Sequence, residues 1–122
     1  MIIEVMDKRT NNRISEFIAA LAKKDKQLVK AFLFGSYAKE LDNEESDIDL
    51  ALVINDLDDK EKFNLQVQLL LMASKFDSRI EPHPISANES IENSPFYDEI
   101  LKTGIEIEVK EPALWYEKKD IK

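Results

Sequence analysis

The chain contains no cysteine, and this absence excludes several classes of protein. Disulfide scaffolds, thiolate zinc sites and cysteine nucleophiles all need that residue, and a chain without disulfides suits a reducing cytoplasm. Glycine occurs twice and proline four times, which is too seldom for a collagen-like or low-complexity chain. No apolar run approaches the roughly 20 residues that span a bilayer, and residues 1–13 have no apolar signal core. We therefore expect a cytoplasmic protein with no membrane partner.

Basic residues are also in the minority. The chain has 17 basic and 25 acidic residues, and its formal net charge is −8. This balance argues against nucleic-acid binding, because affinity for the phosphate backbone comes from lysine and arginine. Hydrophobic residues make up 43% of the 122 residues, which is enough for a core. We expect one domain over residues 1–122.

Hydrophobic spacing predicts strands that alternate with helices. The predicted elements are a helix over 11–26, strands over 28–34 and 47–54, a helix over 59–75, an extended segment over 78–85, a short helix from Ser94-Pro95 to Gly104, and a strand over 105–109. Asn11 or Asn12 is expected to cap the first helix, and Pro82 and Pro84 place the extended segment at a sheet edge. The predicted fold class is α/β (α+β), a small layered domain with one sheet.

The helix over 59–75 is apolar on most of its surface. Phe63, Val67, Leu70 and Leu71 mark one face, and Leu65, Leu69 and Met72 widen it. This pattern predicts a heavily buried helix.

Two short motifs at predicted strand ends carry the chemistry. Gly35-Ser36 follows the first strand, and Asp47-Ile48-Asp49 begins the second after ten intervening residues. Asp47 and Asp49 would point to one face of the strand, roughly 6–7 Å apart at the Cα atoms. Such carboxylates repel unless a cation lies between them, and Mg²⁺ is commonly held by one or two carboxylates and substrate phosphates. The glycine lets the backbone approach a ligand closely, and the serine hydroxyl can bind a phosphate oxygen.

This pattern resembles the signature of the nucleotidyltransferase superfamily that includes DNA polymerase beta. At this length the chain looks like a minimal nucleotidyltransferase domain, from the small prokaryotic branch often partnered with a HEPN-domain protein. The resemblance implies the nucleotidyltransferase fold, a mixed β-sheet flanked by helices. The same resemblance implies a nucleoside triphosphate donor, two Mg²⁺ ions for which Mn²⁺ can substitute, and transfer of a nucleoside monophosphate with release of pyrophosphate. It also implies that Gly35 and Ser36 hold the triphosphate and that Asp47 and Asp49 are catalytic metal ligands.

The family uses a third carboxylate on a later strand, and Glu81 matches it by its order in the chain. The resemblance gives Glu81 a metal-binding and catalytic role, and it could act as general base toward the acceptor hydroxyl. One departure from the family concerns the nucleotide-binding segment, where many relatives have Arg-Gly and this chain has Lys39-Glu40. Lys39 keeps the cation but loses the bidentate fork of arginine.

Four other residues have both a structural and a functional interpretation. His83 could bind metal or transfer a proton, or could be an ordinary exposed histidine. Arg79 could contact phosphate or form a local ion pair. Trp115 and Tyr116 could anchor a partner or pack back onto the domain.

Two functional hypotheses follow. The first is an enzyme that transfers AMP from ATP to an acceptor hydroxyl, with a HEPN toxin as the cognate acceptor. The second is a non-catalytic antitoxin or regulatory subunit that acts by protein contact.

Overall fold

Two central strands form the middle of the sheet that carries the candidate site. The computed structural model describes residues 8–35, 47–88 and 95–109. Strand β1 (Leu28–Phe34) and strand β2 (Ile48–Ile54) run antiparallel to each other. Each of these predicted strands is confirmed, the second with a start one residue later. Ile48, Leu50 and Leu52 are fully buried, as expected for a central strand whose apolar residues face a packed layer.

The sheet is mixed. Strand β3 (Ile80–Ser86) pairs parallel with β2, and the short β4 (Ile105–Ile107) pairs antiparallel with β1, so that the order is β3-β2-β1-β4. The expected edge position of the proline-containing segment is therefore confirmed. Pro82 and Pro84 cannot donate ladder hydrogen bonds, and among the described strands β3 has a neighbour on only one side.

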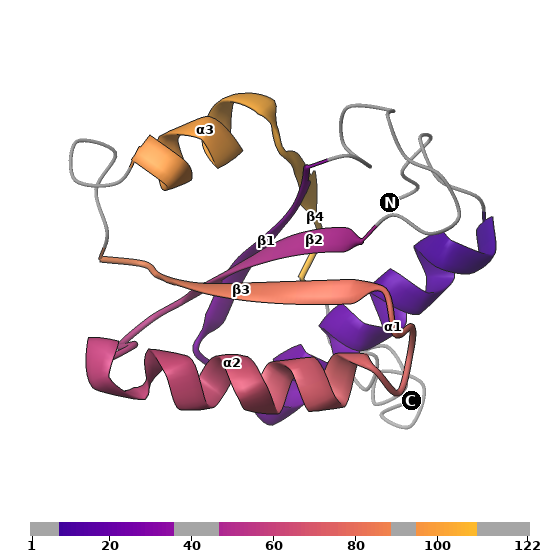
Figure 1. Ribbon diagram of the computed structural model, residues 1–122, viewed down its shortest axis with the longest axis horizontal. Helices are drawn as coiled ribbons and strands as arrows, with labels where there is room; N and C mark the ends of the chain where they lie inside the picture. The colour runs from indigo at the N-terminus through magenta and orange to yellow at the C-terminus, as the bar shows by residue number, and fades with distance from the viewer. Residues whose placement is uncertain (1–7, 36–46, 89–94, 110–122) are drawn as a thin grey trace, which may run out of the picture.

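Helices cover both faces of this sheet. Helix α1 (Lys8–Lys24) and helix α2 (Asp59–Ala73) lie on one face, and helix α3 (Pro95–Thr103) lies on the other (Figure 1). The predicted mixed sheet flanked by helices is confirmed. No helix among the described residues is long and apolar enough to cross a membrane.

Alternating strand residues divide the core into two layers. The larger layer joins α1 and α2 to the sheet through residues that include Phe17, Leu50 and Leu69. The smaller layer, under α3, contains Val53 and Ile100. Helix α3 begins at a proline and is followed by Gly104, whose N–H donates to the Ile100 carbonyl (2.7 Å) as predicted for this helix end.

Two helical predictions were wrong in part. Helix α1 begins by Lys8, so Asn11 and Asn12 lie inside it and do not cap it. Helix α2 is not heavily buried, since within it only Leu69 and Ala73 are buried. The sheet and α1 cover one side of α2, and no described residue covers the side formed by its apolar residues Phe63, Val67, Leu70 and Leu71.

Candidate active site

The candidate site lies on the α3 face of the sheet, where three strands meet. In the sheet register Asp49 of β2 is opposite Glu81 of β3 and opposite Phe34 of β1. Because side chains alternate along a strand, the neighbours Ile48 and Leu50 point into the opposite core layer, as predicted. The parallel pairing of β2 with β3 begins with a backbone hydrogen bond from the Ile48 N–H to the Arg79 carbonyl (2.8 Å). This register brings Asp49 and Glu81 together.

A histidine completes the cluster. His83 follows Glu81 by two residues and shares its face of β3, and its Nε2 lies 3.2 Å from Asp49 Oδ1 and 3.7 Å from Glu81 Oε1. Ligand atoms of Asp49, Glu81 and His83 all lie within 4.8 Å of one another. The side chains of Asp49 and His83 are partly exposed, at 24% and 27%, so solvent and ligands can reach them.

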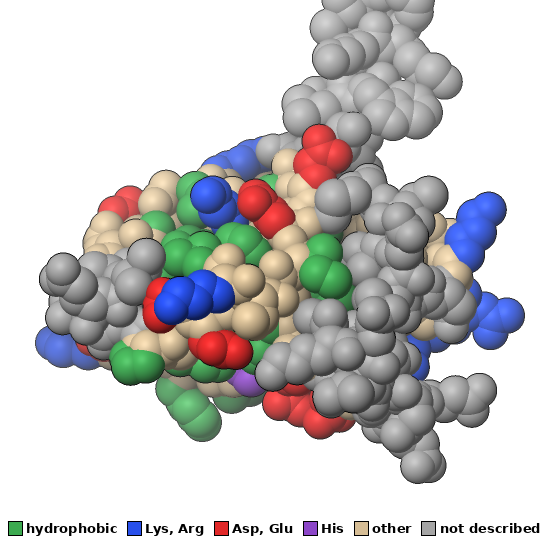
Figure 2. Space-filling model, turned by 90° about the horizontal axis from the view of Figure 1, so that it is seen from above, with side chains coloured by type: hydrophobic (Ala, Val, Ile, Leu, Met, Phe, Trp, Pro, Cys, Tyr) green, Lys and Arg blue, Asp and Glu red, His purple; other side chains and the backbone are tan. Residues whose placement is uncertain are grey.

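The imidazole of His83 is held in place by aromatic rings. Its centroid lies 5.2 Å from that of Phe34 and 6.3 Å from that of Phe96 on α3, and the two phenylalanine rings meet edge to face at 5.4 Å. Such edge contacts favour one ring orientation. Viewed from the α3 side, hydrophobic, acidic and basic side chains lie on the same face of the molecule (Figure 2).

Neighbouring carboxylates shift the pKa of Glu81. Its pKa is raised, first by a side-chain hydrogen bond with Asp47, then by burial, and then by the charges of Asp47 and Asp49, while His83 acts in the opposite direction. Carboxylates this close share a proton when no cation separates them. Carboxylate oxygens with one imidazole nitrogen form a donor set that suits a divalent cation such as Mg²⁺ or Mn²⁺.

Gly35 meets the cluster at the end of β1. Its φ is +77°, and a Cβ at this position would lie 2.5 Å from Asp49 Oδ2. The position therefore requires glycine twice over, for the backbone conformation and for the close approach of the Asp49 carboxylate. The other predicted nucleotide-binding residues, Ser36 and Lys39, lie outside the described residues, as do Trp115 and Tyr116.

Arg79 is directed away from this cluster. Its guanidinium donates to Asp77 Oδ1 and Oδ2 and to the hydroxyl of Thr10 on α1 (2.8–3.1 Å). Of the two interpretations of Arg79, the structure therefore shows the local ion pair, with Asp77 as the partner. For His83 the sequence allowed both a functional and a structural interpretation, and its spacing of two residues from Glu81 is the signal that puts both side chains on one face of β3.

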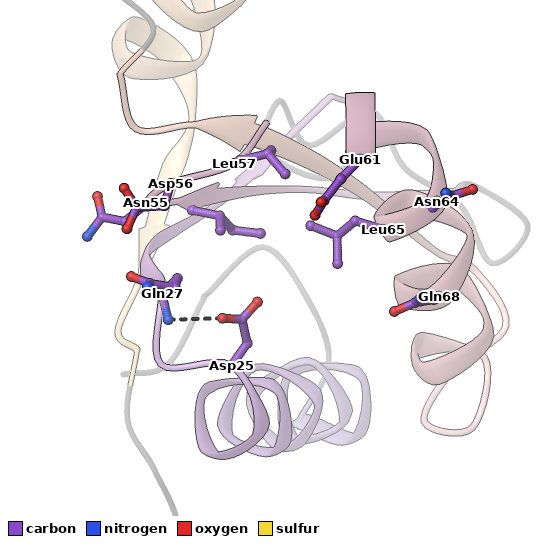
Figure 3. Close-up of a pocket in the computed structure, with 10 residues that line it drawn as sticks. Asp25, Gln27, Asn55, Asp56, Leu57, Glu61, Asn64, Leu65 and Gln68 are labelled. Carbon is purple, nitrogen blue, oxygen red and sulfur yellow. Dashed lines mark hydrogen bonds between the residues drawn. The ribbon is translucent and has the colours of Figure 1, made fainter. Parts of the chain in front are cut away.

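A pocket of about 410 Å³ lies elsewhere, at the far end of β2. Asn55 and Asp56 line it from the end of that strand, Gln27 from the start of β1, and Glu61 from α2 (Figure 3). None of the residues that line this pocket belongs to the carboxylate cluster, so the pocket is separate from the candidate site.

Comparison with known proteins gives the family. Residues 16–112 match the family described as "Polymerase beta, Nucleotidyltransferase". The chain belongs to this nucleotidyltransferase family. The match spans Gly35, Asp47, Asp49 and Glu81, which are the residues that carried the resemblance in the sequence. A search of curated proteins found no significant match.

Two solved structures are similar to this nucleotidyltransferase-family chain. A proposed nucleotidyltransferase from Sulfolobus solfataricus is 20% identical with a TM-score of 0.57, and the match covers 78% of this chain and 76% of that one. A toxin–antitoxin structure with AMP-PNP is 26% identical with a TM-score of 0.54, and the match covers 75% of this chain and 70% of that one. The first likeness shows the shared fold.

Proposed function

We propose that this chain is a metal-dependent nucleotidyltransferase that transfers AMP from ATP to an acceptor hydroxyl. The observation that carries the proposal is the register that sets Asp49 opposite Glu81, with Gly35 against the Asp49 carboxylate. Family membership supports the reaction class, and the toxin–antitoxin structure with AMP-PNP supports an adenine nucleotide as donor. In the reaction, the acceptor oxygen bonds to the α-phosphorus, and the bond from that phosphorus to the β-phosphate oxygen breaks to release pyrophosphate.

The metal-binding residues of the proposal are Asp47, Asp49 and Glu81, with His83 as an added nitrogen donor. Bound divalent ions, two by analogy with the family, would neutralise charge on the phosphate oxygens. Glu81 is a partly exposed carboxylate of the cluster, and a carboxylate within reach of the acceptor can act as a general base. We assign Glu81 to accept the proton of the acceptor hydroxyl at a carboxylate oxygen.

The chain's other residues bind and orient the donor. Gly35 lies directly against the Asp49 carboxylate, and a backbone without a side chain lets a phosphate approach it closely. Ser36 and Lys39 are assigned to the triphosphate by their place in the motif. The imidazole of His83, held by Phe34 and Phe96, orients the Asp49 carboxylate toward the site.

The acceptor in this proposal is a hydroxyl side chain on a cognate HEPN toxin. The likeness to a toxin–antitoxin structure supports a protein partner. The experiment mixes the chain with labelled ATP, Mg²⁺ or Mn²⁺ and the product of the neighbouring gene, and it compares Asp49→Asn with Asp56→Asn. The second variant is a matched control, because Asp56 lies at the other end of β2 with a positive φ that asparagine tolerates. Transfer that stops in Asp49→Asn and continues in Asp56→Asn supports the enzyme, and transfer that continues in both would refute it.

The second candidate function is a non-catalytic antitoxin that acts by contact. The same likeness to a toxin–antitoxin structure favours it. The two functions separate in a neutralisation assay. If Asp49→Asn still neutralises the partner, the chain acts by contact. If the variant loses both neutralisation and label transfer, the chain acts by catalysis.

A further inference from the structure

One aromatic ring beside the carboxylate cluster is open to solvent. Phe96 is the second residue of α3, which lies over the same face of the sheet as the cluster (Figure 1), and its exposed fraction is 48%. A single exposed apolar side chain is ordinary in a folded protein. Phe96 differs from such a residue because it packs against two further rings, and one of these contacts Asp49. Its open surface therefore borders the candidate active site.

Phe96 stands one ring away from the carboxylate. The Nε2 atom of His83 lies 3.2 Å from Asp49 Oδ1, and the His83 ring centroid lies 6.3 Å from that of Phe96. The planes of Phe96 and His83 meet at 60°, and those of Phe96 and Phe34 meet at 82°. Neither neighbouring ring lies parallel to Phe96, so a flat ligand ring can still stack on its exposed surface.

The donor of the proposed function has its parts in the same order. There the carboxylate cluster serves the α-phosphate, and in a nucleoside triphosphate one ribose separates this phosphate from the base. In the protein, one imidazole separates Asp49 from Phe96. A base that extends from the phosphate along the α3 side would reach the exposed ring. Bases stack on aromatic side chains whatever their hydrogen-bond pattern, because every base has a π-face.

The place of Phe96 on the sheet favours the donor over the acceptor. Phe34 ends β1 and immediately precedes Gly35, which the proposed function assigns to the triphosphate. Glu81, which is assigned to the acceptor hydroxyl, lies on β3, and β2 separates that strand from β1. The ring of Phe96 is closer to that of Phe34 (5.4 Å) than to that of His83 on β3 (6.3 Å). Phe96 therefore lies on the donor side of the cluster.

We propose that Phe96 is the stacking surface for the nucleobase of the donor, an inference that rests on the proposed function. The ring adds affinity for the nucleoside part of the donor and none for its phosphates. It offers no hydrogen bond, so it selects a flat ring rather than one particular base. Phe34 and His83 contact the Phe96 ring and restrict its rotation, which reduces the entropy that is lost when the base binds.

Comparing two ligands separates the base from the phosphates. Isothermal titration of the full chain in MnCl₂ gives Kd for ATP and for inorganic tripolyphosphate, which has the phosphates but no base. Phe96→Ala should raise Kd for ATP about tenfold and leave Kd for tripolyphosphate at the parent value. Phe96→Trp should keep the affinity for ATP. Leu101→Ala is the matched control, because Leu101 is exposed on the same helix (38%) and should change neither Kd.

Fluorescence supplies a direct signature of stacking. In Phe96→Trp the new indole should be quenched by ATP and should not respond to tripolyphosphate, because only the base can lie against the ring. The natural sequence has one tryptophan, Trp115, so the parent chain titrated in the same way gives the background signal. An indole at position 96 that responds equally to both ligands would contradict stacking.

Two results of the titrations overturn the proposal and leave the proposed function intact. Equal losses of ATP and tripolyphosphate affinity in Phe96→Ala would mean that Phe96 only holds His83 in place. Unchanged ATP affinity in that variant would remove Phe96 from the donor site, and slower labelling of the partner would then assign it to the acceptor. A parent chain that binds neither ligand would refute the proposed function and the stacking surface together.

Discussion

Gly35 and Asp49 lie so close that a Cβ on residue 35 would be 2.5 Å from the Asp49 Oδ2 atom. The glycine comes from the end of β1, and the aspartate comes from the neighbouring strand β2. Since φ at Gly35 is +77°, the backbone turn and the carboxylate position depend on the same residue. Gly35 and Asp49, which belong to two separate motifs in the sequence, are therefore in direct contact in the fold.

The first prediction concerns Gly35→Ala. The left-handed backbone alone costs about 1–2 kcal/mol for alanine, and the new methyl group displaces the Asp49 carboxylate from the cluster. We expect a lower melting temperature and at least a tenfold loss of Mn²⁺ affinity, measured by thermal unfolding with and without MnCl₂. Gly104→Ala is the matched control. Its Cβ would meet the Ile100 carbonyl at 2.6 Å, so it should lower stability without changing the affinity for the metal.

The second prediction is that Asp49→Asn abolishes stabilisation by metal. The charge of Asp49 raises the Glu81 pKa less than Asp47 and burial do, so we expect little change in the free energy of unfolding in EDTA. In the parent chain, metal at 100 times its Kd should add about 2.7 kcal/mol to the free energy of unfolding. That increment should be absent in the variant. Urea unfolding in EDTA and in MnCl₂ measures both, and a variant that keeps the metal increment would contradict the assignment of Asp49 as a ligand.

The third prediction separates the two roles of His83. His83→Phe keeps a ring against Phe34 and Phe96 but removes the nitrogen that faces Asp49. Imidazole is a better ligand for Mn²⁺ than for Mg²⁺, which prefers oxygen. We expect about tenfold weaker Mn²⁺ binding, Mg²⁺ binding within threefold of the parent, and little change in stability. Isothermal titration with each metal measures the difference. Equal losses for both metals would mean that His83 only positions Asp49.

Much of the site followed from strand geometry. The spacing of Asp47 and Asp49 predicted a shared face, and the order of elements predicted that Glu81 could join them once β3 lay beside β2. Both depend on the two-residue repeat of a strand, which a sequence displays directly. The sequence left two interpretations of His83 open, because a single histidine between two prolines forms no pattern. Only the register, which sets His83 opposite Ala51, places its ring beside Asp49.

The burial of α2 could not be predicted for a different reason. Apolar residues occur all around this helix, so the sequence does not tell which face meets the sheet. Tertiary packing selected the face with Leu69 and Ala73 and left Phe63 and Leu71 exposed. The start of α1 was misplaced because Asn11 is a favourable cap by composition, although here it is buried within the helix. Hydrophobic pattern thus predicts elements better than it predicts their environment.

The fourth prediction concerns pH and Asp77. This buried carboxylate accepts hydrogen bonds from Arg79 and Arg13, and they lower its pKa from 3.8 to about 2. Because the folded pKa lies below the unfolded value, the stabilisation is complete above about pH 4 and is lost as pH falls toward 2. The shift corresponds to about 2 kcal/mol of unfolding free energy. Glu81 acts in the opposite sense, since its raised pKa favours the folded state at low pH and this effect is lost as pH rises through the raised value.

Urea unfolding at pH 7, 4, 3 and 2 isolates the contribution of Asp77. Asp77→Asn leaves Arg79 without its buried counter-charge, and we expect a loss of about 3 kcal/mol at pH 7. The variant should then lose about 2 kcal/mol less than the parent between pH 4 and pH 2, because it has no carboxyl to protonate at that position. Glu106→Gln, at an exposed position on β4, is the matched control and should follow the parent at every pH. Parallel losses in the parent and Asp77→Asn would show that other carboxyl groups cause the acid sensitivity and that the Asp77–Arg79 pair contributes nothing to it.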